Sequence, residues 1–108
     1  MNDIKDLVRQ HKDLIVNTRR ELHRIPEPAY TEEKTAGYVA DYLRKEGLEV
    51  RTGVAKFGVV GSLDLAGPGR TLMFRADMDA LPVKEETGLA FASTHEGAMH
   101  ACGHDAHM

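Results

Sequence analysis

The chain has 108 residues, of which 42% are hydrophobic and 29% charged, enough for one modest core but not for a large enzyme. Its net charge of −3, with both signs interspersed, leaves no basic patch for binding nucleic acid. No apolar run approaches the roughly 20 residues that cross a bilayer, and residues 1–13 are too polar for a signal peptide. We therefore expect a cytoplasmic protein that contacts neither nucleic acid nor membrane.

Residues 3–24 are predicted to form one helix. Their apolar positions have the spacing of a single helical face, namely Ile4, Leu7, Val8, Leu14, Ile15, Leu22 and Ile25. Asn2 or Asp3 can cap the helix, and Pro26 and Pro28 end it. The opposite face is charged, which is typical of a solvated surface.

A second helix is predicted after the prolines, with Thr31 as N-cap, acidic residues in its first turn, and Gly47 as its stop. The connecting motif HRIPEPAYTEEKT places His23, Glu27 and Glu32 near a turn. Side chains in such positions are usually capping or surface groups, and we interpret them so.

Beyond Gly47 the period changes to that of strands. Residues 48–53, 57–65 and 70–79 are short β-branched and apolar runs, and the turn signal AGPGR favours a hairpin between the last two. Two helices and three strands predict an α/β or α+β arrangement. The run TLMF at 71–74 should be buried.

Three charged residues end the third predicted strand. Active sites of open α/β sheets lie outside the carboxyl ends of strands. Asp77 and Asp79 are two apart and share one face of an extended chain, where they could meet a metal or a metal-bound histidine. Arg75 most simply pairs with one of them. Residues 82–97 have no clean period and are expected to form a loop that leads to the last ten residues.

The last ten residues, MHACGHDAHM, concentrate metal-ligand chemistry. They hold the only cysteine and three of the six histidines, and the candidate positions are His100, Cys102, His104, Asp105 and His107. Thiolate, imidazole and carboxylate are ligands of transition metals, whereas one cysteine cannot form an internal disulfide. Cys102 and His104 can converge only outside a helix, and Gly103 between them favours a tight turn. We predict a metal loop that runs into a helix starting near Asp105.

Each candidate has a plainer interpretation. Cys102 could be a small buried residue and His104 a histidine satisfied by hydrogen bonds, although their proximity favours two metal ligands. His100 and His107 fit local hydrogen bonding or facing the site better than ligation. Asp105 fits the N-cap of the last helix better than a ligand. A thiol hydrolase using Cys102 would need a histidine base from elsewhere, because such bases are rarely two residues away.

Three segments together resemble a known family. RRELHRIPEPAYTEEKT, FRADMDALPVKEETGLAF and MHACGHDAHM look like the N-terminal part of the amidohydrolase branch of the aminoacylase and carboxypeptidase metallopeptidase superfamily. This branch includes hippurate hydrolase, N-acetyldiaminopimelate deacetylase and hydrolases of auxin–amino acid conjugates. The resemblance covers nearly the whole chain, and the motifs occur in the family's order.

The resemblance implies roles for individual residues. The cysteine and histidine of the CGH motif are metal ligands in this branch, which carries over to Cys102 and His104. Asp77 lies where the wider superfamily has a ligand histidine, so we do not expect it to bind metal directly. Asp79 matches an aspartate that orients such a histidine.

The resemblance also implies a larger enzyme. It would be a di-metal α/β catalytic domain with an inserted domain for binding and dimerisation, holding two divalent ions (zinc, manganese, cobalt or nickel) and hydrolysing the amide bond of N-acyl amino acids. Residues 1–108 would be the N-terminal part of the catalytic domain, without the inserted domain or the glutamate that acts as general base. The alternative is a truncated, inactive fragment or a non-catalytic module. Since the sheet edge and an apolar face would lack cover, we expect 108 residues alone to be marginally stable and prone to associate.

Overall fold

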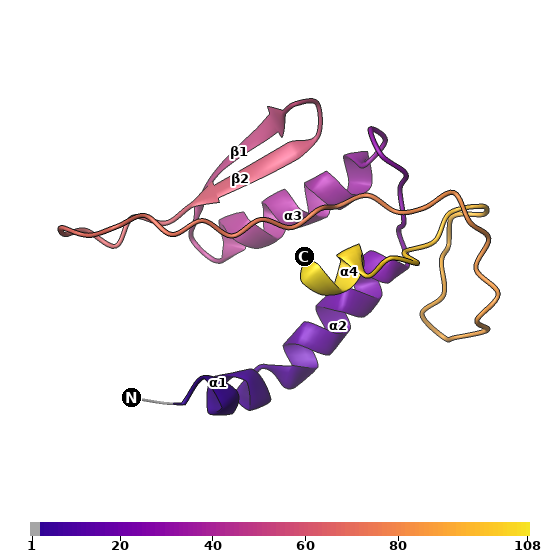
Figure 1. Ribbon diagram of the computed structural model, residues 1–108, viewed down its shortest axis with the longest axis horizontal. Helices are drawn as coiled ribbons and strands as arrows, with labels where there is room; N and C mark the ends of the chain where they lie inside the picture. The colour runs from indigo at the N-terminus through magenta and orange to yellow at the C-terminus, as the bar shows by residue number, and fades with distance from the viewer. Residues whose placement is uncertain (1–2) are drawn as a thin grey trace.

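Two helices meeting at a break form the N-terminal arm, as seen in the computed structural model, which describes residues 3–108 (Figure 1). Helix α1 spans Ile4–Gln10, and α2 spans Lys12–His23. The single helix predicted for residues 3–24 is therefore wrong at His11, whose Nδ1 lies 2.8 Å from the Leu7 carbonyl oxygen. Such a local side-chain contact competes with the regular helical pattern. Asp3 caps α1 as expected, while the alternative cap Asn2 lies outside the described residues.

Helix α3 spans Glu33–Lys45, but its N-terminus is not capped as predicted. Thr31 donates its hydroxyl to the Pro28 carbonyl, 2.6 Å away, and Glu32 occupies the N-cap without a side-chain hydrogen bond. At the other end, the predicted glycine stop is confirmed. Gly47 adopts a left-handed backbone with φ of 85°, and the chain turns there into the first strand.

A hairpin packs on α3 (Figure 1). Strands β1 (Glu49–Val54) and β2 (Gly58–Ser62) are antiparallel, with an irregularity between Arg51 and Val54. The predicted hairpin of the second and third strands is thus wrong, because the first two pair instead. Gly61 allows the close approach, since a Cβ there would lie 3.0 Å from side-chain atoms of Leu43 and Leu48.

The third predicted strand, residues 70–79, is extended but unpaired. Leu72, Met73 and Phe74 expose 77%, 83% and 88% of their surface, so the predicted burial of this run is wrong. The physical reason is that a strand exists only beside a neighbour, and no segment among residues 3–108 pairs with this one. Figure 1 shows it running as a long arm past α3.

The core is small and lies where α2, α3 and the C-terminal segment meet. Its buried hydrophobic residues are Leu22, Ala36, Ala40, Ala80 and Ala98. The last helix, α4 (His104–His107), packs on α2. The radius of gyration is 15.5 Å, larger than the roughly 13 Å of a compact chain of this length. No helix within residues 3–108 has both the length and the apolar character needed to span a bilayer.

Tyr38 on α3 provides a test of how α3 packs against α2. Burial, and then the hydrogen bond from its hydroxyl to Glu21, raise the pKa of Tyr38 to about 12. The unfolded phenol ionises near pH 10, so this contribution to stability is complete below about pH 10 and is lost as the pH rises towards about 12. In an absorbance titration at about 295 nm, Tyr38→Phe should remove the step near pH 12 and Tyr30→Phe should keep it. Absence of an ionisation step near pH 12 in the folded chain would contradict this packing.

Candidate metal site

Short backbone bridges bring the three sequence motifs together. The Ala80 amide donates to the Glu27 carbonyl at 2.8 Å, and Pro28 and Ala80 form a parallel bridge. One residue further, Leu81 and Met99 exchange two hydrogen bonds of 3.0 Å in an antiparallel bridge. The segment that carries Asp79 is thereby held between the turn after α2 and the start of the cysteine–histidine stretch.

Asp79 and His104 meet in this arrangement. The Nδ1 atom of His104 lies 3.0 Å from both the backbone oxygen and the Oδ1 atom of Asp79. An N–H at Nδ1 that donates to these oxygens leaves Nε2 with its lone pair available. A carboxylate that fixes one ring nitrogen in this way commonly supports a metal-ligating histidine.

Cys102 lies two residues before His104 on a loop. Its thiol is exposed, so the interpretation as a small buried residue is wrong. Gly103 has a left-handed backbone with φ of 95° and occupies the N-cap of α4, which confirms a tight, non-helical turn before the helix. No group of three histidine, cysteine, aspartate or glutamate side chains within residues 3–108 is placed to hold a metal ion.

The two aspartates of the DMD motif have different neighbours. Asp77 is half-exposed and forms an ion pair with Arg75 at 2.7 Å, as predicted for Arg75, whereas Asp79 contacts His104. The structure therefore does not direct both carboxylates to one point. Arg75 is largely exposed, because the extended segment that carries it is not covered.

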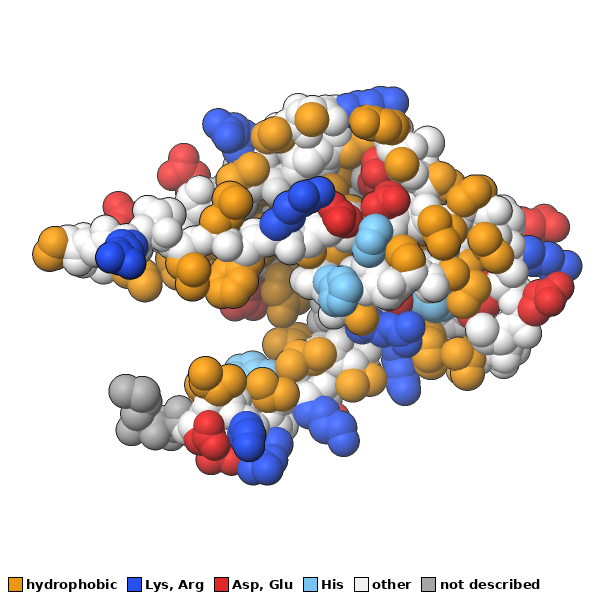
Figure 2. Space-filling model, viewed as in Figure 1, with side chains coloured by type: hydrophobic (Ala, Val, Ile, Leu, Met, Phe, Trp, Pro, Cys, Tyr) orange, Lys and Arg blue, Asp and Glu red, His pale blue; other side chains and the backbone are white. Residues whose placement is uncertain are grey.

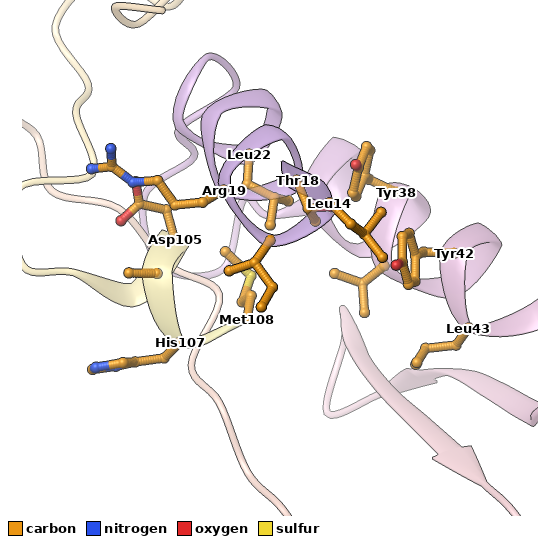
Figure 3. Close-up of a pocket in the computed structure, with 13 residues that line it drawn as sticks. Leu14, Thr18, Arg19, Leu22, Tyr38, Tyr42, Leu43, Asp105, His107 and Met108 are labelled. Atoms are coloured by element: carbon orange, nitrogen blue, oxygen red, sulfur yellow. The ribbon is translucent and has the colours of Figure 1, made fainter. Parts of the chain in front are cut away.

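Asp105 does not cap the last helix as predicted, because Gly103 holds that position. Its side chain is buried, and its Oδ2 atom lies 2.8 Å from Nε of Arg19 and 2.7 Å from Nδ1 of His23. Figure 3 shows the Arg19 guanidinium beside the Asp105 carboxylate at the junction of α2 and α4. Asp105 is therefore a contact between helices.

The sequence predicts a surface or capping role for His23, but only 2% of the residue is exposed. Its Nε2 atom lies 2.9 Å from Oε1 of Glu85, whose side chain is also buried. Burial alone would raise the pKa of Glu85, but hydrogen bonds from Thr87 and Ser93 and the contact with His23 lower it below its usual value. The spacing of four between Arg19 and His23 could have shown that they share a helical face, although not what they contact. We call Arg19, His23, Glu85 and Asp105 the buried ion cluster.

For Glu27 the capping interpretation is confirmed. It is 8% exposed, and its Oε1 atom accepts hydrogen bonds from the backbone and the hydroxyl of Thr35, at 2.6 Å and 2.7 Å. Its Oε2 atom accepts from the Lys34 amide at 3.1 Å. These amides belong to the first turn of α3, so Glu27 caps that helix from six residues before it begins.

The two remaining histidines of the last ten residues, His100 and His107, differ in burial. His100 is 3% exposed, its ring lies 6.4 Å from that of His23, and neither ring nitrogen has a partner in the described part of the chain. The local hydrogen bond expected for it is absent there, and burial lowers the pKa of His100. His107 is exposed, and Figure 3 shows its ring directed away from α2. Histidine side chains are visible near the centre of the face shown in Figure 2.

Comparisons with known proteins agree on one relationship. The family model described as Peptidase family M20/M25/M40 matches residues 73–108. Thermostable carboxypeptidase 1 of Saccharolobus solfataricus is 49% identical over 106 residues, which are 97% of this chain and 27% of the relative. An N-acetyldiaminopimelate deacetylase of Listeria monocytogenes is 52% identical over 93 residues, covering 83% of this chain and 24% of the relative.

Solved structures give the same picture. A protein described as an aminohydrolase, from methicillin-resistant Staphylococcus aureus, superposes with a TM-score of 0.87 and 45% identity over 93% of this chain and 26% of that one. A dinuclear metal-binding peptidase of the M20 family from Bacillus subtilis gives 0.81 and 38%, over 90% of this chain and 27% of that one. The chain spans about a quarter of the length of the relatives it matches.

Proposed function

Because the chain belongs to the M20/M25/M40 peptidase family, matching the N-terminal part of its members, we propose that it forms part of a metal-dependent amidohydrolase. The proposed reaction is hydrolysis of the amide bond of an N-acyl amino acid to a carboxylic acid and a free amino acid. Relatives named deacetylase and carboxypeptidase support this reaction class. In this proposal residues 1–108 are the N-terminal part of the catalytic domain of a longer enzyme, which contains an inserted domain and forms a homodimer.

The single observation that supports metal chemistry is the contact between His104 and Asp79. It directs one nitrogen of the His104 imidazole to a carboxylate and leaves the other available, and the thiol of Cys102, two residues earlier in the chain, is exposed. Thiolate and imidazole are donors that suit zinc, and imidazole also suits nickel or cobalt. The donor types fit a transition metal, and two donors form half of a four-coordinate site.

We propose that Cys102 and His104 hold one ion of a pair of divalent metals, with zinc, manganese, cobalt and nickel as candidates. Such an ion supplies Lewis-acid polarisation of the amide carbonyl and activation of a water molecule as nucleophile. Asp79 fixes the tautomer of His104 by accepting from its Nδ1. In this proposal no residue of this chain is the general base. Four other candidates do not bind the metal directly, namely Asp77, His100, Asp105 and His107.

A second candidate is a module without catalysis. It is favoured by the finding that no three candidate ligands cluster within residues 3–108 and that the extended segment exposes its apolar side chains. Such a chain would fold or pair with other chains but bind no metal through Cys102.

Metal binding separates the two candidates. The 108-residue chain, dialysed against Co²⁺, should show thiolate-to-cobalt absorption in the near ultraviolet and retain about one equivalent of metal by mass spectrometry. Cys102→Ser should abolish the absorption, and His104→Ala, which removes a ligand, should weaken binding. His107→Ala, which removes an exposed histidine of the same helix, is the matched control and should bind like the wild type.

Alkylation by iodoacetamide tests the same site from the other side. Bound metal should protect Cys102, whereas a nucleophilic cysteine of a thiol hydrolase would react equally fast with and without metal. Absence of cobalt absorption in the wild-type chain, together with unprotected alkylation, would contradict the proposed metal site.

A further inference from the structure

His23 occupies an unusual position for a helix-terminal histidine. It is the last residue of α2 and almost fully buried, and each ring nitrogen faces a carboxylate distant in sequence. Nδ1 lies 2.7 Å from Oδ2 of Asp105, and Nε2 lies 2.9 Å from Oε1 of Glu85. A ring that carries a proton on both nitrogens donates to both carboxylates at once.

The buried ion cluster pairs basic with acidic side chains. Two basic side chains, Arg19 and His23, face two carboxylates, Asp105 and Glu85. Buried charges persist only when paired, and removing one member leaves its partner uncompensated. The Arg19 side chain is 37% exposed and that of His23 only 2%. Of the two contacts of the Asp105 carboxylate, the one with His23 is therefore the one shielded from water. Phe91 lies edge-on to the His23 ring at 5.5 Å and shields it further.

Asp105 connects His23 to the candidate metal loop. It is the second residue of α4, directly after His104, and α4 has only four residues. A helix of this length has no stability of its own, so its position depends on tertiary contacts. The loop is fixed on one side by Asp79, which contacts His104, and on the other by the contact of Asp105 with α2.

Through Glu85, His23 also contacts the segment that leads into the metal loop. Its Oε1 atom also accepts the Ser93 amide at 3.0 Å, which closes the loop between residues 85 and 93. His23 therefore fastens both the approach to the metal loop and the helix that follows it. No amide side chain can replace it, because asparagine or glutamine donates from a single nitrogen and cannot serve carboxylates on two sides.

We propose that His23 is a positioning residue for the metal site, holding Asp105 and Glu85 so that Cys102 and His104 are presented together. This inference rests on the proposed function for its metal readout, but the positioning itself can be measured without metal.

The test compares His23→Gln with His11→Gln, a control at an exposed histidine on the same arm. In the metal-free chain, the hydrogen bonds from Ala106 to Gly103 and from Met108 to His104 report on α4. Amide exchange at Ala106 and Met108, followed by nuclear magnetic resonance, should lose protection in His23→Gln and keep it in His11→Gln. The amides of α3 should stay protected in both, which shows that the chain is still folded.

The metal readout is the cobalt spectrum. His23→Gln should weaken Co²⁺ binding by roughly 10- to 100-fold and change the thiolate absorption, while His11→Gln should leave both unchanged. If His23→Gln unfolds the chain, Asp105→Asn probes the same contact from its other side and should give the same loss of α4 protection. Unaltered exchange at Ala106 and Met108 in the folded variant would overturn the positioning role. Lost protection in a chain whose wild type binds no cobalt would uphold it and reject the proposed metal site.

Discussion

Replacing Glu27 with alanine should lower the free energy of unfolding by about 3 kcal/mol. The carboxylate accepts three hydrogen bonds from Lys34 and Thr35, and Thr35 is completely buried. Loss of a helix cap costs about 0.5–2 kcal/mol, and leaving buried donors unpaired costs about 1–3 kcal/mol. Urea unfolding followed by circular dichroism at about 222 nm measures the loss as a lower midpoint.

The matched control is Glu33→Ala. Glu33 is an exposed acid in the first turn of the same helix, where its charge suits the helix dipole but its side chain caps nothing. Its replacement should cost well under about 1 kcal/mol. Equal midpoints for the two variants would show that Glu27 is not the cap. Because the Glu27 carbonyl also binds the Ala80 amide, a frayed start of α3 should disturb the neighbouring Asp79 as well.

Charged substitutions in the extended segment should suppress self-association. Met73→Lys combined with Phe74→Glu removes two side chains that are 83% and 88% exposed. Burying such side chains against another molecule is worth about 1.5–3 kcal/mol each, so the double variant should need at least about tenfold higher concentration to associate. Sedimentation velocity over a concentration series gives the comparison.

The control for this prediction is Val83→Lys with Leu89→Glu. These residues are 45% and 47% exposed but lie outside the extended segment, in the loop between Leu81 and Met99. The control should associate like the wild type. A wild-type chain that stays monomeric throughout, with a reversible thermal transition independent of concentration, would contradict the prediction. Figure 2 shows hydrophobic side chains along the extended segment and beside the hollow under it.

Local patterns predicted the elements that depend on neighbours in sequence. The α3 period and the stop at Gly47 correspond to a helix that ends there, and the first two β-rich runs form the hairpin. Strand formation at residues 70–79 could not be decided locally, because a strand requires a partner and burial requires a covering layer. The same apolar run that predicts a core strand is exposed where no partner is present.

The candidate site was predictable in composition but not in its contacts. Residue chemistry singled out Cys102 and His104, and the turn at Gly103 follows from the flexibility of glycine. The sequence predicts capping or surface roles for His23 and Glu27, because polar residues near a proline turn usually have them. Glu27 does cap a helix, whereas His23 is buried. The carboxylates that His23 contacts lie 82 and 62 positions away, and spacing along one helix carries no information on what packs against it.

The distances in sequence between contacting residues have a consequence for the order of folding. Helix α3 and its hairpin are built from contacts within residues 33–62, so loop closure there is short and inexpensive. The two hydrogen bonds of His23, by contrast, join residues 62 and 82 positions apart. We expect the α3–hairpin unit to form early during synthesis and the contact between α2 and α4 to close late. A metal ion would then encounter Cys102 and His104 while the segment that carries them is still mobile, before the contact between α2 and α4 has formed.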